Sequence, residues 1–405
     1  MTETAIEAFA DEAESFLTAN AKRTESASAE WGVGDDTMSG YAARTEADER
    51  ERVRAAKAWK ATEFDAGFGW IGGPVESGGR GLSAEHERTY LEMRTEYDIA
   101  DLGVYGISLG MVAPSFLKFG QEGIRSIVPS MYRGDLIGCQ LFSEPGAGSD
   151  VAGLSTRAER DGDEWVLNGQ KVWTSVAHLA DWGLLLARSN PDAPKHKGIT
   201  AFAVDMKSPG VEVRPLKMMT GGTEFNEVFF NDARVPDTHR LGDIDSGWTV
   251  AISTLMNERA LGAAGSDVFG VRSTLERLRM TIALPGMGSD DPIIRQGVAK
   301  IYSMAETIRY QSNAADVRRK AGLPPGPAES LFKLASTETL RVALDLIGHV
   351  LGPRAIADTG EWGMYAWADM ILTGPAMRLA GGSDEILRNI LGERVLGLPK
   401  EPGLR

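Results

Sequence analysis

Residues 143–150 read Ser-Glu-Pro-Gly-Ala-Gly-Ser-Asp, and residues 168–175 read Asn-Gly-Gln-Lys-Val-Trp-Thr-Ser. In the first stretch, glycines let the backbone approach a ligand closely, and Ser143 and Ser149 supply hydroxyls that donate or accept hydrogen bonds. In the second stretch, the indole of Trp173 stands beside two hydroxyls. A loop like the first is by itself most often a simple turn. Together, the two stretches indicate a site for a polar, planar cofactor.

The spacing of apolar residues changes along the chain around these stretches. From residue 5 to about 131, apolar residues mostly recur at helical spacing, with a Gly/Pro-rich break at 69–81. From 141 to about 243, turn residues separate short β-type runs at 164–167, 183–187, 200–204, 211–213 and 227–230. From Trp248 onward helical spacing returns. The pattern predicts an α+β fold with N-terminal helices, a small β domain and a C-terminal helical bundle.

Two shorter patterns give local predictions. Asn168-Gly169 stands between β-type runs, and this pair is a strong signal for the turn of a β-hairpin. A stripe of apolar residues in the C-terminal part predicts one face of an amphipathic helix. Its members are Ile294, Val298, Ile301, Ala305 and Ile308.

Composition excludes several classes of protein. The 405 residues carry 43 basic and 57 acidic side chains, a formal net charge of −14, which argues against a general nucleic-acid binder. With Cys139 as the one cysteine and five scattered histidines, neither a disulfide nor a metal site is expected. No stretch approaches the roughly 18 apolar residues of a membrane helix, and the acidic N-terminus is unlike a signal peptide. We therefore expect a cytoplasmic protein that binds neither membranes nor nucleic acid.

The two opening stretches, in this order and at this spacing, resemble the two flavin-binding signatures of the acyl-CoA dehydrogenase family. Further matches run along nearly the whole chain. They are Gly-Pro-Val-Glu-Ser-Gly-Gly-Arg-Gly at 73–81, Phe-Asn-Glu-Val-Phe-Phe at 225–230, Val-Pro at 235–236, Gly-Gly-Ser-Asp-Glu-Ile at 381–386 and Arg-Asn-Ile-Leu-Gly-Glu-Arg-Val-Leu-Gly-Leu-Pro at 388–399. The resemblance implies an all-α domain at 1–140, a β-barrel-like middle domain at 141–245 and a four-helix bundle at 246–405.

The resemblance also implies FAD as cofactor, α,β-desaturation of an acyl-CoA substrate, and an electron-transferring flavoprotein as the acceptor. Phe142 and Ser143 would contact the pyrimidine side of the flavin, and Ser149 would lie near the junction of flavin and thioester, where it also meets substrate. Trp173 would cover the ring, although an aromatic core residue is the alternative. Thr174 follows in the same flavin-binding segment, and Ser175 replaces a threonine whose hydroxyl bonds flavin N5 in relatives.

A base is needed to remove the Cα proton. Most relatives use a glutamate directly before the Gly-Thr/Ser of the C-terminal motif, where this chain has Gly381, which keeps only the backbone N–H. Isovaleryl- and long-chain-type relatives place the base in a Glu-Arg pair on the helix that opens the C-terminal domain, and this chain has Glu258-Arg259 there. The resemblance therefore implies Glu258 as base and Arg259 as a ligand contact or a charge partner. The alternative is that Glu258 is a solvated helical carboxylate, as we expect for Glu385.

The chain departs from homotetrameric relatives where a neighbouring subunit holds the adenine half of FAD. Residues 284–288 read Leu-Pro-Gly-Met-Gly in place of Arg-x-x-Phe-Gly, and residues 345–349 read Asp-Leu-Ile-Gly-His in place of Gln-x-x-Gly-Gly. Loss of the arginine removes a charge-assisted contact to pyrophosphate, and an added carboxylate repels it. Two assemblies stay open, a homotetramer that binds FAD through other residues and an α2β2 heterotetramer with a paralogue. The last motif resembles the actinobacterial branch with paired assemblies.

Two rival functions remain. A non-catalytic or half-site subunit would explain Gly381 and the altered adenine segments. A flavin oxidase or monooxygenase on the same fold would instead react rapidly with oxygen. The sequence leaves open whether the acyl group derives from a fatty acid or a steroid side chain, and whether coenzyme A or a carrier protein bears it.

Overall fold

The computed structural model describes residues 3–24, 31–32, 36, 38, 41, 43–263, 270–321, 323 and 326–400, without the side chains of residues 3–5, 258–263, 316, 319 and 320. The chain forms two compact units. The first comprises Met1–Ala27, Arg44–Lys217 and Thr223–Thr254, and the second comprises Ser28–Ala43, Met218–Gly222 and Leu255–Arg405.

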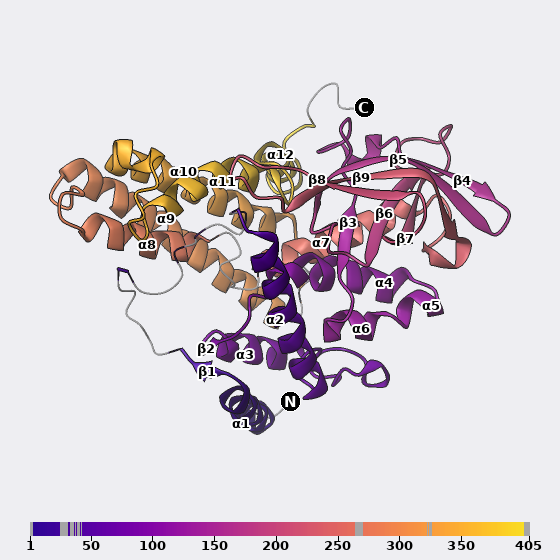
Figure 1. Ribbon diagram of the computed structural model, residues 1–405, viewed down its shortest axis with the longest axis horizontal. Coiled ribbons are helices and arrows are strands. Elements are labelled where there is room, and N and C mark those ends of the chain that lie inside the picture. The colour runs from indigo at the N-terminus through magenta and orange to yellow at the C-terminus, as the bar shows by residue number, and fades with distance from the viewer. Residues whose placement is uncertain are drawn as a thin grey trace. The chain divides into compact units, whose positions relative to one another are not determined.

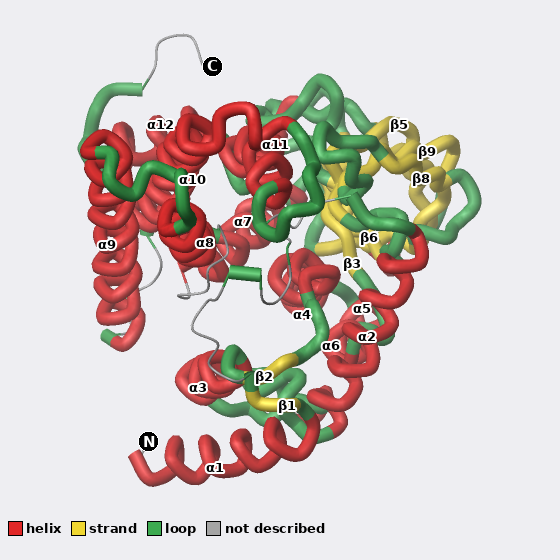
Figure 2. The backbone as a smooth tube through the Cα atoms, turned by 60° about the vertical axis from the view of Figure 1, so that its left-hand side comes forward, coloured by secondary structure: helices red, strands yellow, loops and turns green. Residues whose placement is uncertain are grey.

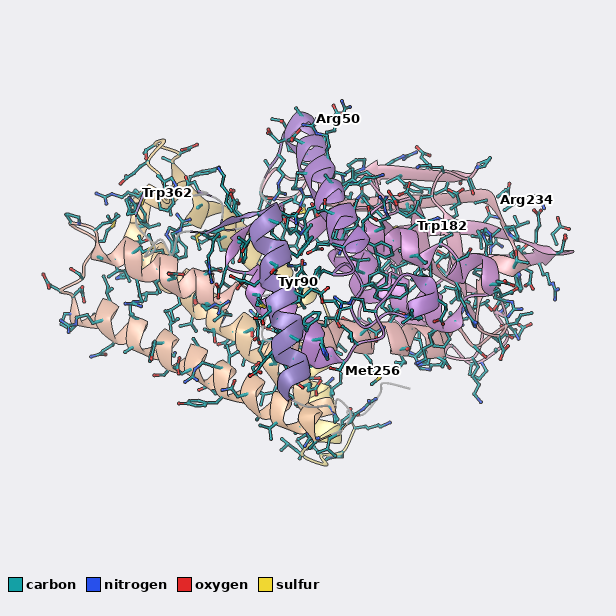
Figure 3. All side chains as sticks on the ribbon, turned by 90° about the horizontal axis from the view of Figure 1, so that it is seen from below. Arg50, Tyr90, Trp182, Arg234, Met256 and Trp362 are labelled. Atoms are coloured by element: carbon teal, nitrogen blue, oxygen red, sulfur yellow. The ribbon has the colours of Figure 1, made fainter. Side chains whose placement is uncertain are left out.

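Helices of the first unit surround an aromatic core that includes Phe9, Phe68 and Tyr90 (Figure 3 labels Tyr90). The helices are α1 (Glu3–Asn20), α2 (Glu46–Asp65), α3 (Ala84–Arg94), α4 (Ala113–Phe119), α5 (Glu122–Arg125) and α6 (Val128–Arg133), and β1 (Lys22–Arg23) pairs antiparallel with β2 (Tyr97–Asp98). Thr45 begins α2 because its hydroxyl accepts a hydrogen bond from the Asp48 N–H (3.1 Å). The predicted break at 69–81 contains turns and a short 3-10 helix, η1 (Val75–Ser77).

An eight-stranded sheet follows these helices in the first unit (Figure 1). Its strands are β3 (Gly138–Leu141), β4 (Arg157–Asp161), β5 (Glu164–Ser175), β6 (Trp182–Arg188), β7 (Ile199–Asp205), β8 (Val211–Pro215), β9 (Phe225–Pro236) and β10 (Arg240–Leu241). Their order is β10-β7-β6-β4-β5-β9-β8, and β3 pairs parallel with β6. The antiparallel pair of β5 and β9 carries the second of the two opening stretches, so this pair positions the candidate site.

The hairpin predicted at Asn168-Gly169 is wrong, because both residues lie inside β5 and the chain turns at Gly162 instead. The Asn168 side chain bonds across to β9, donating to the Asp232 carboxylate (2.9 Å) and accepting from the Asp232 N–H (3.0 Å). At Gly169 a Cβ would come within 2.5 Å of the Thr156 hydroxyl, beside a shift in the register of β5 and β9. Asn168 is thus explained by a cross-strand hydrogen bond and Gly169 by a close approach. These two requirements select the same dipeptide that a hairpin turn would.

Helices dominate the second unit. They are α8 (Val271–Ala283), α9 (Pro292–Lys320), α10 (Ser330–Leu351), α11 (Tyr365–Leu379) and α12 (Asp384–Arg394), and α7 (Gly247–Ala263) runs from the first unit into the second. Figure 2 shows α9 beside α8 and α10, and α10 also packs against α11 and α12. Ile294, Ile301 and Ile308 are buried along α9, which confirms the predicted apolar stripe.

The architecture is α+β, as predicted, with helices before and after the sheet. Within the described ranges, no helix is long and apolar enough to cross a membrane. The same part of the chain contains no cluster of three or more His, Cys, Asp or Glu residues that could bind a metal ion.

Candidate functional site

The structure brings the two opening stretches together in the first unit. Lys171 Nζ donates to the carbonyl of Phe142 (3.0 Å), and the Val172 N–H donates to the carbonyl of Ser143 (2.9 Å). The loop that begins at Phe142 therefore lies directly against β5. Glu144 and Ala147 close its turn through two reciprocal backbone hydrogen bonds of 3.0 Å. Segments far apart in the sequence thus form one surface.

A buried ion pair fastens this loop to the strand. Lys171 Nζ lies 2.8 Å from Glu144 Oε1, and the lysine side chain has no exposed surface. The second oxygen of Glu144 accepts hydrogen bonds from the N–H (2.6 Å) and the hydroxyl (2.7 Å) of Ser155, and Oε1 also accepts from the Thr156 N–H (2.9 Å). Because charges and donors converge on one carboxylate, the loop has little freedom to move.

The charges of this pair are maintained at neutral pH. Burial works to raise the pKa of Glu144, but the Lys171 ammonium and the donors at Ser155 and Thr156 outweigh it and hold that pKa well below its usual value. Burial lowers the pKa of Lys171 to about 8, against the opposing effect of Glu144. Sequence reasoning assigned no role to either residue. The alternation of side chains along the strand could have indicated that Lys171 is buried, because it is an even number of residues away from the buried Trp165 and Leu167.

Trp173 occupies a strained position on the same strand. Its φ is +59°, in the left-handed region, at a register shift between Lys171 and Thr174. Its side chain is 61% exposed and meets the Phe225 ring edge-on, with centroids 6.1 Å apart. The prediction of a flavin-facing indole stays untested, but an aromatic core residue is excluded for this chain by the exposure. A strained residue with an exposed large aromatic side chain indicates a functional position.

The two residues after Trp173 differ in burial. Thr174 is buried, its carbonyl accepts from the Asn226 side chain (3.0 Å), and its hydroxyl has no partner among the described residues. Ser175 is half-buried at the end of β5. On the opposing loop Phe142 is buried, Ser143 is half-buried and Ser149 is exposed. The hydroxyls of the loop and of the end of β5 therefore range from buried to exposed.

These residues fit a flavin. A Cβ added at Gly146 or Gly148 would meet no atom of the described chain within 4 Å, so packing inside the chain does not require either glycine. The glycines leave open space beside the loop, and the strand against which the loop lies carries the exposed indole of Trp173 and the buried Thr174 hydroxyl, which has no partner among the described residues. An isoalloxazine ring needs such a combination, since it has polar edges and two flat faces.

The positive φ at residue 173 predicts that a glycine variant is more stable than an alanine variant, the opposite of the order in an ordinary strand. We expect Trp173→Gly to be more stable than Trp173→Ala by about 1 kcal/mol, because alanine retains the Cβ that penalises a positive φ. Urea unfolding of both variants measures the difference. Trp173→Phe, which keeps an aromatic face, is the control for cofactor retention. Greater stability of the alanine variant would contradict the strained conformation.

In the second unit, Gly381 and Gly382 form the turn between α11 and α12, with φ values of +68° and +91°. Among the residues that the structure describes, none accepts a hydrogen bond from the Gly381 N–H. Asp384, at the start of α12, is 1% exposed and accepts hydrogen bonds from Arg378 Nε (2.7 Å) and the Thr337 hydroxyl (3.0 Å). Sequence reasoning missed this aspartate, because an acidic residue in the first turn of a helix is usually a surface residue. Glu385 is exposed, as expected.

Glu258 and Arg259 lie on α7, but their side chains are outside the described residues. The pair therefore lies on a helix, as predicted. Met256, two residues earlier, is 44% exposed (Figure 3).

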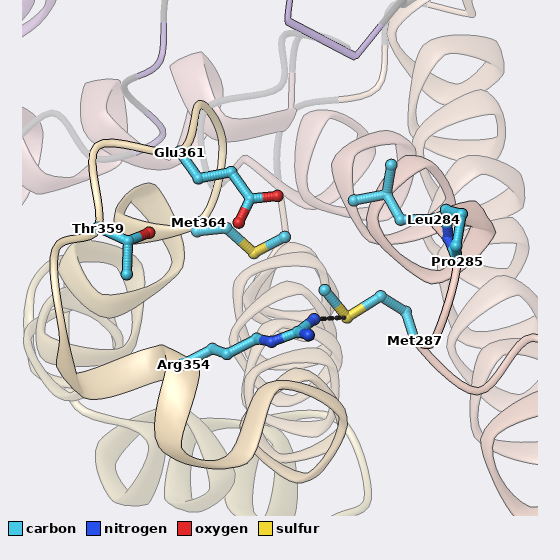
Figure 4. Close-up of a pocket in the computed structure, with 7 residues that line it drawn as sticks. All are labelled: Leu284, Pro285, Met287, Arg354, Thr359, Glu361 and Met364. Carbon is cyan, nitrogen blue, oxygen red and sulfur yellow. Dashed lines mark hydrogen bonds between the residues drawn. The ribbon is translucent and has the colours of Figure 1, made fainter.

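The first segment that departs from relatives, 284–288, lines a pocket of about 320 Å³ in the second unit (Figure 4). The lining residues are Leu284, Pro285, Met287, Arg354, Thr359, Glu361 and Met364. Arg354 Nη1 donates to the sulfur of Met287 (3.3 Å). At the second segment, Asp345 is paired with Arg341 (2.6 Å), which offsets part of the repulsion expected from its carboxylate.

The chain is similar to known proteins over most of its length. The family model for the acyl-CoA dehydrogenase middle domain matches residues 139–233, and the model for the acyl-CoA dehydrogenase C-terminal domain matches residues 245–396. Acyl-CoA dehydrogenase IpdE1 of Mycobacterium tuberculosis is 37% identical over 362 residues, which cover 87% of this chain and 90% of that protein.

Solved structures give the same result. The steroid ACAD Tcur3481-Tcur3483 is 25% identical with a TM-score of 0.76, over 99% of each chain. The ChsE4-ChsE5 complex from Mycobacterium tuberculosis is 26% identical with a TM-score of 0.74, also over 99% of each chain.

Proposed function

The chain belongs to the acyl-CoA dehydrogenase family, and from that premise we propose that it desaturates an acyl-CoA thioester with Glu258 as the base. The observation that carries the proposal is the surface built from the loop at 142–149 and the end of β5, with its buried ion pair and its strained, exposed indole. Phe142, Ser143, Ser149, Trp173, Thr174 and Ser175 would hold FAD there. Bound oxidised flavin supplies an acceptor for the hydride that leaves Cβ.

The chain's own residues would remove the proton and stabilise the developing negative charge. The carboxylate of Glu258 takes the weakly acidic Cα proton of the thioester. As that proton leaves, negative charge grows on the thioester oxygen, and the Gly381 N–H donates to it. Glycine at this position supports the assignment of the base to α7, since the turn offers a donor and no carboxylate. Arg259 and Ser149 would contact the substrate.

The proposal is tested by anaerobic titration of the purified protein with a panel of acyl-CoAs, fatty and steroid-derived. We expect the flavin absorbance to bleach and an electron-transferring flavoprotein, rather than oxygen, to restore it. Steroid-derived thioesters are the favoured class because one structural relative is named a steroid ACAD. Rapid reoxidation by oxygen would support an oxidase or monooxygenase. Absence of bleaching with every thioester would support the non-catalytic subunit.

We further propose that the protein works as an α2β2 heterotetramer with a paralogue. The segments at 284–288 and 345–349 lack the arginine and glutamine that hold the adenine half of FAD in homotetrameric relatives. The pocket that this first segment lines has one cation, Arg354, and one carboxylate, Glu361, and the segment itself contributes only apolar side chains to it. A structural relative is itself named as a complex of two proteins.

Purification of the chain alone gives the corresponding prediction. We expect FAD well below one equivalent per chain, and a rise toward the full equivalent on co-expression with an adjacent-gene paralogue. Flavin absorbance against protein concentration measures the ratio. Stoichiometric FAD and turnover by the isolated chain would contradict obligate pairing and leave the homotetramer.

A further inference from the structure

The charged cluster beneath the Gly381-Gly382 turn has no place in the mechanism described so far. We infer that Lys333, Arg378 and Asp384 are positioning residues that hold the Gly381 N–H in the orientation in which it polarises the thioester carbonyl. The inference rests on the proposed function and concerns residues of the second unit alone.

Lys333 bridges both sides of the turn. Its Nζ donates to the carbonyl of Gly382 (2.8 Å) and to the carbonyl of Arg378 (3.2 Å) in the last turn of α11. Two consecutive glycines have wide conformational freedom, because neither has a Cβ. Bonds to a carbonyl before the turn and to one within it restrict that freedom. The lysine therefore fixes the 378–379 and 382–383 peptide planes, which lie on either side of the peptide that carries the Gly381 N–H.

Asp384 orders the two cations. It accepts from Arg378 Nε (2.7 Å), and its other oxygen accepts from the Thr337 hydroxyl (3.0 Å) and lies 3.4 Å from Lys333 Nζ. Burial works to raise the pKa of Asp384, but hydrogen bonds from Arg378 and Thr337 and the charge of Lys333 outweigh it and lower that pKa. The carboxylate thus remains charged while almost fully buried.

Helix capping does not explain this burial. Ser383 already caps α12, since its hydroxyl accepts from the Ile386 N–H (3.4 Å). A buried charge is costly unless it is paired and hydrogen-bonded, and Asp384 is both. Its bonds to Arg378 and Thr337 tie α12 to α11 and α10 at the turn whose Gly381 N–H has no acceptor among the described residues. Loss of one well-placed oxyanion donor typically costs roughly 100-fold or more in rate, so small displacements of this turn matter.

The test uses a chromophoric thioester, dimethylaminocinnamoyl-CoA, whose absorption band moves to longer wavelength when its carbonyl is polarised. We expect a clear red shift on binding to the wild-type holoenzyme, and loss of more than about half of that shift in Asp384→Asn and Lys333→Met. The same variants should lose roughly 10-fold or more in kcat with little change in KM. Glu385→Gln removes an exposed carboxylate from the neighbouring position and should retain both properties.

The full red shift and kcat in both variants would overturn the inference while the proposed function stands. If Asp384→Asn does not fold, Lys333→Met decides by the same two measurements. A wild-type holoenzyme that binds the probe without any red shift would overturn the proposed function and this inference together. Loss of the shift also in Glu385→Gln would overturn the specific role of the buried cluster.

Discussion

Replacement of Glu258 by glutamine is expected to slow the bleaching of the flavin by acyl-CoA by at least about 100-fold. Glutamine preserves the size and the helix propensity of the side chain but cannot accept the Cα proton. Since Gly381 supplies no carboxylate, no second base is available on the turn to compensate. Anaerobic stopped-flow measurement of flavin absorbance under single-turnover conditions isolates this step from reoxidation.

Glu385→Gln is the matched control. It makes the same chemical change in the second unit, at an exposed position on α12, and should leave the rate of bleaching unchanged. An unaltered rate in Glu258→Gln would reject the assignment of the base, and the solvated carboxylate would be the correct interpretation. Retention of bound FAD in both variants shows that the comparison concerns the chemistry and not the cofactor.

Replacement of Lys171 by methionine is expected to destabilise the first unit by about 3–5 kcal/mol, the usual cost of leaving one charge of a buried pair without its partner. Glu144 would keep its hydrogen bonds from Ser155 and Thr156 but lose its paired cation, leaving, among the described residues, only the unpaired charge of Arg188 nearby. The loop at 142–149 should then loosen and FAD should dissociate more easily. Urea unfolding followed by circular dichroism, together with flavin fluorescence, measures both effects.

Two variants sharpen this prediction. Lys195→Met removes a lysine from an exposed pair with Asp150 at the end of the same loop, and should cost no more than about 1 kcal/mol. The double variant Glu144→Gln/Lys171→Met removes both charges and should recover part of the lost stability, because no unpaired charge stays buried. Equal losses of stability in Lys171→Met and Lys195→Met would show that the buried Lys171 pair stabilises the protein no more than an exposed pair does.

The sequence predicted the architecture correctly wherever the spacing of apolar residues repeats. Helical spacing along 294–308 corresponds to buried residues of α9, and the β-type runs correspond to strands of one sheet. The motif order also identified the family before any geometry was known. Repeated patterns are reliable because one face of each element must be buried.

Local signals were less reliable where one dipeptide serves several purposes. Asn168-Gly169 has the sequence of a hairpin turn, yet asparagine forms a cross-strand bond and glycine allows the close approach of Thr156. The Lys171–Glu144 and Asp384–Lys333 pairs escaped prediction for another reason. Each joins residues distant in the sequence, and burial of a charge depends on a partner that only the fold supplies.

Proton exchange at Cα measures removal of the Cα proton separately from hydride transfer. An acyl-CoA in which sulfur replaces Cβ cannot give up a hydride, so only removal of the Cα proton remains. Incubated in D2O with the wild-type holoenzyme, its Cα hydrogens should exchange with solvent, as followed by proton NMR. We expect exchange to be slower by at least about 100-fold in Glu258→Gln. Exchange at the wild-type rate in that variant would contradict the assignment of Glu258 as base, because another group would then be removing the proton.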